Sequence, residues 1–218
     1  SYSVTGVQTC ALPIFQPSQF RAVADALRLA WDPARHVLVS TMTGLTALDI
    51  ETTLGLGPIP VVRAMPNTAI AVRQSMTCLC SRNAGPGALE ACKALFSCLG
   101  EVIELEEGLM KAATVLAASN VAFVMRMIRA LIQGGIQLGF HSDDAQEIAV
   151  QVVKGAAALL AQRHSHPEME IDKVTTPRGC TIEGLNEMEH RGLSSAIIKG
   201  LVASYDKIAG IKKEAGGE

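Results

Sequence analysis

The stretch Thr175–Gly192, TTPRGCTIEGLNEMEHRG, combines a proline, a glycine and a hydroxyl residue at the start of a predicted helix. Thr176 is a plausible N-cap, and Pro177 suits the first helical position. Gly179 permits close approach of another group to the backbone. The pattern predicts a helix whose first turn is open to a ligand; a plain capped helix after a loop is the alternative.

The amides of that first turn, around Cys180 and Thr181, have no acceptor within the helix, and the helix dipole favours negative charge near them. Backbone amides at a helix N-terminus bind small anions for this reason. A carboxylate is therefore the ligand expected to bind at this turn.

The first half of the chain alternates predicted helices and strands. Helical spacing of apolar residues follows Ser18, an N-cap candidate, and Thr43 is expected to cap a second helix that stops at Gly55. A third predicted helix spans 87–99 and is closed by Gly100. Predicted strands are 36–40, 60–64, 76–80 and 101–105. This alternation predicts an α/β region with a parallel sheet.

Beyond Leu109 the pattern is wholly helical. A long apolar helix is expected to about Leu138, another begins at Ser142, and two terminal helices follow a polar loop near His164. We therefore expect an α/β part followed by an all-α part, with the boundary near Gly108.

The long helix is apolar or small on all sides, so it needs burial on several sides. A second subunit is the expected source of that cover, and a self-contained helical bundle is the alternative. Arg126 and Arg129 interrupt the apolar run before the ~20 residues that a membrane span requires, which predicts no membrane partner.

Charge and cysteine content exclude some classes of protein. Nineteen basic and twenty-one acidic side chains give a net charge of −2, which indicates no nucleic-acid partner. The six cysteines lack C-x-x-C pairs and lie among apolar residues, which favours reduced, buried thiols and a cytoplasmic location.

Three segments in the same order, MPNT at Met65–Thr68, EEGLM at Glu106–Met110 and TPRGCTIEGL at Thr176–Leu185, resemble the pyrroline-5-carboxylate reductase family. The resemblance runs from about Phe15 to about Ile208. It implies a doubly wound, Rossmann-like domain that binds NADPH or NADH, followed by a helical domain whose helices interlock in a homodimer. The implied reaction reduces 1-pyrroline-5-carboxylate to L-proline, the last step of proline biosynthesis.

The resemblance assigns domains as well. Residues 15–108 correspond to the carboxyl-terminal half of the dinucleotide-binding domain, and residues 109–212 to the helical dimerisation and substrate domain. Residues 1–14 match nothing in the family and are interpreted as a leader; 213–218 form a tail. Because no G-x-G-x-x-G occurs in the chain, the glycine-rich phosphate loop is expected to precede Phe15, and the enzyme is expected to be incomplete.

Residues near the ends of predicted strands match the family's NADP (or NAD) contacts, as the carboxyl ends of parallel strands usually bind ligands. The implied cofactor-binding residues are Pro17, Thr41, Met42, Thr43, Met65, Pro66, Asn67 and Thr68. Taken singly, each is also compatible with an ordinary turn.

On the substrate side, Thr181 is the implied catalytic residue, which positions or relays a proton. The implied substrate-binding residues are Glu107, Lys173, Thr176, Gly179, Cys180 and Thr181. Arg178 stands where the family has glycine and Lys173 where asparagine is common; added positive charge near a carboxylate site favours binding. For Glu107, a surface glutamate at a domain junction is the alternative interpretation.

Other residue clusters give weaker signals. His164, His166 and Glu168 have metal-binding side chains, but no second segment of the chain supplies further ligands. Glu187 with His190 is typical of a surface pair. No metal is therefore predicted. Two other functions stay open. One is a related reductase of another imine or oxo-acid, and the other is a catalytically silent dimerisation module or truncated gene product.

Overall fold

The computed structural model describes residues 19–214 except 33 and 164. The expected leader 1–14, the expected cofactor contact Pro17, the cap candidate Ser18 and His164 lie outside the described residues. Contacts divide the chain into two compact units, which are described separately. One holds the described residues up to Ala118 with those from Tyr205 onward, and the other is Ser119–Ser204.

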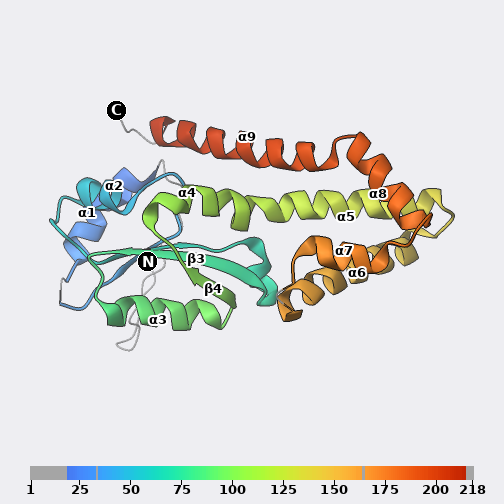
Figure 1. Ribbon diagram of the computed structural model, residues 1–218. Coiled ribbons are helices and arrows are strands. Elements are labelled where there is room, and N and C mark those ends of the chain that lie inside the picture. Colours follow the sequence, from blue (N-terminus) through green and yellow to red (C-terminus); the bar gives the residue numbers. More distant parts are fainter. Residues whose placement is uncertain (1–18, 33, 164, 215–218) are drawn as a thin grey trace. The chain divides into compact units, whose positions relative to one another are not determined.

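The first unit is α/β (Figure 1). Its strands are β1 Leu38–Ser40, β2 Val61–Met65, β3 Ser75–Arg82 and β4 Gly100–Glu104, and its helices are α1 Phe20–Ala30, α2 Ala47–Leu54, α3 Pro86–Ser97 and α4 Met110–Ala113. The strands lie in the order β1-β2-β3-β4. All four predicted strands are present, and an all-α part follows them, which confirms the expected fold class.

The sheet is mixed, so the expectation of a wholly parallel sheet was wrong. Strands β1 and β2 are parallel, as are β3 and β4, but β2 and β3 are antiparallel. A parallel crossover needs a dozen or more residues, usually with a helix. Residues 66–74 hold only the 3₁₀ turn Thr68–Val72, so the chain must turn back along β2.

Each face of the sheet is covered by different helices (Figure 1). Apolar residues of α3 pack on the face that carries Val62, Ala64 and Leu79. The alternate residues of the strands point to the other face, where Val61 packs with α1 and α2 and Met65 packs with α4. The period-2 alternation of a strand therefore places apolar clusters on both faces of the sheet, one beneath α3 and two on the opposite face.

Helix α2 begins three residues later than the sequence predicted. Thr46, not Thr43, is its N-cap, because Asp49 completes a capping box: the Asp49 amide donates to Oγ1 of Thr46 and the Thr46 amide donates to the Asp49 carboxylate. Gly55 ends the helix in the left-handed conformation (φ +62°), as predicted.

Helix α3 is also shorter than expected, ending at Ser97. Gly100 does not close it but opens β4 at φ +142°, where a Cβ atom would collide with the Ser75 backbone. Glycine is required there by the close approach of β3.

The second unit is helical. It contains α5 Asn120–Gln137, α6 Ser142–Arg163, α7 Pro167–Val174, α8 Cys180–His190 and the first part of α9 Leu193–Glu214. Helices α5 and α6 lie close together, since a Cβ atom on Gly135 would be 3.1 Å from Cβ of Ala145. Helix α7 was not predicted, although Pro167 at its start and acidic residues in its first turn are the ordinary signals of a helix N-terminus.

The apolar residues of α5 are not buried by this chain. No residue of α5 is buried, and Val124, Met127 and Leu131 are all exposed. Within the continuous helical stretch Glu107–Gln137, an 18-residue window has a mean hydropathy of 1.6, so the stretch is long and apolar enough to cross a membrane, by length and composition only. Just 6 % of this apolar window is buried.

Candidate functional site

Two of the predicted cofactor loops lie at the same edge of the sheet. Because β1 and β2 are parallel, the loop Thr41–Thr43 after β1 and the segment Pro66–Thr68 after β2 leave the sheet in the same direction. Met42 and Met65 are buried, whereas Thr41 and Thr68 are exposed. The methionines anchor the two loops in the core and leave the threonines accessible.

Asn67 fixes the second of these loops by three hydrogen bonds. Its Oδ1 accepts from the Ala69 amide at 2.9 Å, its own amide donates to Oγ of Ser75 at 3.1 Å, and its Nδ2 donates to the Ala117 carbonyl at 2.8 Å. Ala117 lies in the π-helical turn Thr114–Ser119, a kind of turn that often occurs at functional sites. Asn67 therefore joins the turn after β2 to this helical irregularity.

Arg63 was not predicted as a site residue, although a charged residue in the otherwise apolar strand VVRAM is a visible signal. Its side chain is only 6 % exposed. Nη1 lies 3.3 Å from Oε1 of Glu107, and Nη2 donates to the Met42 carbonyl at 3.5 Å. Arg63 thereby connects a predicted substrate residue with a predicted cofactor residue.

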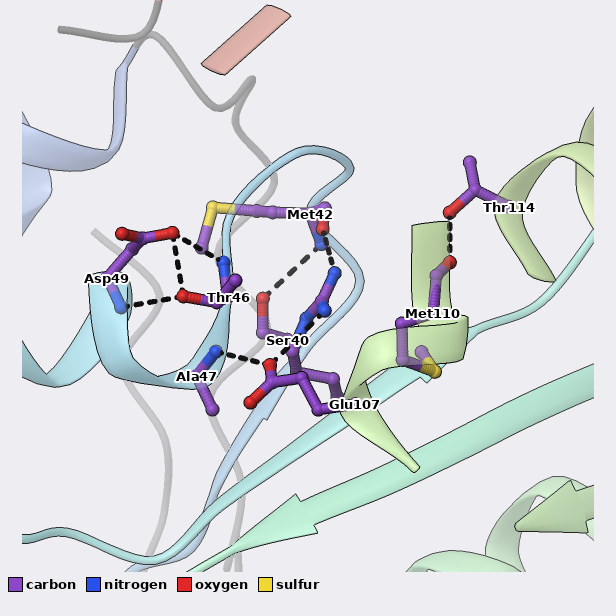
Figure 2. Close-up of polar contacts among 9 residues, drawn as sticks. Ser40, Met42, Thr46, Ala47, Asp49, Glu107, Met110 and Thr114 are labelled. Atoms are coloured by element: carbon purple, nitrogen blue, oxygen red, sulfur yellow. Dashed lines mark hydrogen bonds and ion pairs between the residues drawn. The ribbon is translucent and has the colours of Figure 1, made fainter. Parts of the chain in front are cut away.

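Glu107 also contacts the start of α2 (Figure 2). Its Oε1 accepts from the Ala47 amide at 2.7 Å, in the first turn of the helix, where backbone amides have no helical acceptor. The carboxylate is thus a second cap for α2, beside the capping box of Thr46 and Asp49. We call the group Ser40, Met42, Ala47, Arg63 and Glu107 the Arg63 cluster.

Cys80, which pairs with Arg63 across the sheet, is buried beside this cluster. Burial raises the pKa of the Cys80 thiol to about 11; the positive charge of Arg63 works against this rise and the negative charge of Glu107 adds to it. The thiol therefore stays protonated near neutral pH and does not act as a nucleophile.

In the second unit, the residues before α8 form a turn, so the prediction of Thr176 as N-cap and Pro177 as first helical residue was wrong. The Gly179 amide donates to the Thr176 carbonyl at 2.9 Å, and Arg178 has φ +62°. Proline followed by a residue with positive φ is the type II pattern. This turn takes up the residues that would otherwise begin the helix, and α8 starts at Cys180 with Gly179 as N-cap.

Glycine is required at position 179 by this turn, because a Cβ atom there would collide with Oγ1 of Thr176. No side chain caps α8. Cys180 and Thr181 stand in its first turn and are exposed. The amides predicted to bind an anion are therefore at the start of a helix, as expected, and the turn Thr176–Gly179 directly precedes them.

Lys173 lies in the last turn of α7, six residues before the glycine cap. Its Nζ contacts Oε1 of Glu170 at 2.6 Å; the Lys173 side chain is half exposed, whereas that of Glu170 is mostly buried. Thr176 is exposed in the turn that follows.

The histidine and glutamate pairs have other partners in the structure. Nδ1 of His166 accepts from the Glu168 amide at 3.3 Å and so caps α7, and Glu187 pairs with Arg191 at 2.9 Å. Within 19–32, 34–163 and 165–214, no three His, Cys, Asp or Glu side chains are placed to hold a metal ion.

Comparison with known proteins gives a consistent result. Residues 107–211 match the family model for the pyrroline-5-carboxylate reductase dimerisation domain. Pyrroline-5-carboxylate reductase 1 of Dictyostelium discoideum is 47 % identical over 207 residues, which cover 89 % of this chain and 37 % of that protein. Reductase 2 of the same organism is 45 % identical over 186 residues, covering 79 % of this chain and 62 % of that protein.

Solved structures show the same fold. The pyrroline-5-carboxylate reductase of Coxiella burnetii is 26 % identical, with a TM-score of 0.83 over 94 % of this chain and 75 % of that one. The NADP-bound enzyme of Plasmodium falciparum is 22 % identical, with a TM-score of 0.84 over 91 % of this chain and 79 % of that one.

The chain spans less than two thirds of the length of the two Dictyostelium relatives. Within that span, the agreement in sequence is high and extends through the α/β part and the helical part alike. The chain belongs to the pyrroline-5-carboxylate reductase family.

Proposed function

We propose that this chain reduces 1-pyrroline-5-carboxylate to L-proline with a hydride from NADPH or NADH. The observation that carries the proposal is the identity of 47 % and 45 % with two proteins named as pyrroline-5-carboxylate reductases. The two loops at one edge of the sheet and the uncapped helix start in TPRGCT agree with it. Residues 15–108 then form the cofactor part and 109–212 the dimerisation and substrate part.

The loops at the sheet edge fit a nicotinamide cofactor. Exposed Thr41 and Thr68 offer hydroxyl and backbone groups, and the loops that carry them are anchored by buried Met42 and Met65. In the proposal the cofactor contacts are Thr41, Met42, Thr43, Met65, Pro66, Asn67 and Thr68, with Pro17 outside the described residues. When bound, the cofactor supplies the hydride.

The first turn of α8 suits the substrate's negative end. The amides of Cys180 and Thr181 would hold the carboxylate, with Gly179 allowing close approach and Lys173 adding positive charge. Thr176 and Glu107 complete the proposed substrate contacts. The hydroxyl of Thr181 is too weak an acid to protonate the imine and instead orients or relays a proton at the ring nitrogen.

The direct test is the loss of NADPH absorbance in the presence of 1-pyrroline-5-carboxylate. The purified chain is assayed first, and then a fusion in which it follows the amino-terminal segment of the 45 % identical Dictyostelium reductase. We expect Thr181→Val, which lacks the hydroxyl at equal volume, to lower kcat/KM about tenfold or more, a loss of about 1.4 kcal/mol. Thr181→Ser should retain most activity.

Activity that is indistinguishable from background in both proteins would overturn the proposal. NADPH titration then separates the alternatives. A chain that forms dimers but binds no NADPH is a silent dimerisation module, and one that binds NADPH but is not inhibited by proline acts on another imine or oxo-acid.

We also propose that the chain forms a homodimer in the cytoplasm. The match of 107–211 to a dimerisation domain and the exposed apolar residues of α5 support a second copy as the cover. The five cysteines within the described residues are free thiols, which supports a reducing compartment.

A further inference from the structure

Arg63 occupies a position where an apolar residue would be expected. All five residues of β2 are buried, and the neighbours of Arg63 on the same face, Val61 and Met65, belong to two separate apolar clusters. Placing a guanidinium between them costs desolvation energy, and an apolar side chain of similar volume often stabilises such a site better. The presence of arginine here calls for a role other than packing.

The contacts of Arg63 all lead to one loop. Nη2 donates to the Met42 carbonyl at 3.5 Å, at one end of the segment between β1 and α2. Nη1 lies 3.3 Å from Glu107, whose Oε1 also accepts from the Ala47 amide, at the other end of that segment. Nε is buried and has no hydrogen-bond partner among the described residues. One donor nitrogen thus bonds the loop directly, and a second is joined to its far end through Glu107.

The loop between these two points is also held by the buried side chain of Met42, by Leu45 against the same apolar cluster and by the capping box of Thr46. The Met42 amide donates to Oγ of Ser40 at 3.3 Å, and Gly44 adopts φ +86°, a conformation that suits glycine. Without the guanidinium, the Met42 carbonyl would lose a charged donor and Glu107 would lose its ion pair. Figure 2 shows Met42, Ala47 and Glu107 close together at this set of polar contacts.

We propose that Arg63 is a positioning residue that holds the loop Thr41–Thr46 in one conformation, by its bond to the Met42 carbonyl and through Glu107 at the start of α2. The inference rests on the proposed function, because Thr41, Met42 and Thr43 are the residues proposed to contact the cofactor. Arg63 itself need not touch the cofactor; its effect is to fix the loop in advance and so reduce the entropy lost on binding.

The test uses Arg63→Lys, which keeps the charge but replaces the planar fork with a single ammonium that does not reproduce both contacts. Arg63→Met is the second variant and removes the charge. Arg82→Met is the matched control, because Arg82 is an arginine of the adjacent strand that also pairs with a glutamate, Glu51 of α2, but makes no contact to the loop.

Hydrogen exchange of the Met42 and Ala47 amides is the first measurement. Since hydrogen bonds to charged groups are the stronger ones, we expect exchange about tenfold faster or more in Arg63→Lys and unchanged exchange at these amides in Arg82→Met. The second measurement is NADPH titration by fluorescence, with a Kd raised about tenfold in Arg63→Lys and near the wild-type value in Arg82→Met.

Unchanged exchange in both Arg63 variants would overturn the inference, as would faster exchange with an unaltered Kd. If neither the wild-type chain nor its fusion with the amino-terminal segment binds NADPH, the proposed function fails, and the exchange comparison alone decides whether Arg63 holds the loop. If Arg63→Met does not fold, Arg63→Lys carries the comparison.

Discussion

Glu51 of α2 is a buried carboxylate with a complete set of partners. Oε2 accepts from Nε of Arg82 at 2.8 Å, and Oε1 accepts from the Ile59 amide and the Asn83 side chain. Burial alone would raise the pKa of this carboxyl group, but the bonds from Arg82, Ile59 and Asn83 together outweigh burial and lower the pKa below its ordinary value of 4.5.

We predict that Glu51→Gln lowers the free energy of unfolding at pH 7 by about 1–2 kcal/mol, because Arg82 is partly exposed and regains water. Since the folded pKa is depressed, the carboxylate stabilises the fold fully above pH 4.5, and the stabilisation is lost as pH falls through the folded pKa. Urea denaturation from pH 7 down to pH 3 measures the difference.

The difference between wild type and Glu51→Gln should therefore shrink below about pH 4.5. Glu90→Gln, at an exposed position of α3, is the control and should change the stability by less than about 0.5 kcal/mol. If the stability difference between wild type and Glu51→Gln grew as the pH fell, the lowered pKa of Glu51 would be contradicted.

At the scale of residues, the sequence predicted the positions where the local backbone requires glycine. Gly179 and Gly55 were predicted from such requirements, and the structure contains both. The roles of Arg63 and Glu107 could not be predicted, because Arg63 contacts residues 21 and 44 positions away in the chain. Contacts of that kind depend on how strands and helices are assembled.

At the scale of elements, helix starts depend on competition between neighbouring polar residues. In α2 two threonines were possible caps, and Thr46 is the cap because Asp49 lies three residues after it. Before α8, the type II turn at Thr176–Gly179 prevails over capping by Thr176. In both cases a second residue, not the cap candidate itself, decided the boundary.

Thr46→Ala should destabilise the protein by about 1 kcal/mol, because the Asp49 amide loses its acceptor. Thr46→Ser should recover most of that loss. The free energies come from urea denaturation, and Thr52→Ala, at an exposed position in the same helix, serves as the matched control. Equal stability of the two alanine variants would show that the capping box contributes nothing.

At the scale of the whole molecule, α5 presents an exposed apolar side. Val124, Met127 and Leu131 recur at three and four residues, so they lie on one side of the helix. Arrays of exposed apolar side chains mark interaction surfaces. The family match to a dimerisation domain favours a second copy of this chain over a membrane as the partner.

We expect the wild-type protein to sediment with at least twice the mass of one chain and Leu131→Glu to shift it toward the monomer, because a buried unpaired carboxylate disfavours association. Analytical ultracentrifugation at several concentrations measures the shift. Glu90→Lys, which lies outside the residues matched to the dimerisation domain, should keep the oligomer. A wild-type protein that stays monomeric at high concentration would refute this prediction.

The amino-acid sequence by itself determined the order of the strands and of every helix except α7, the change from α/β to all-α and the family. These follow from periodicity, from glycine and proline positions and from short motifs, all of which act between neighbouring residues. Only the tertiary structure decided that β2 and β3 are antiparallel and that Arg63 joins Met42 to Glu107. The physical reason is that sheet pairing and buried ion pairs join residues distant in the chain, whose meeting depends on connection length and on the packing of the whole unit.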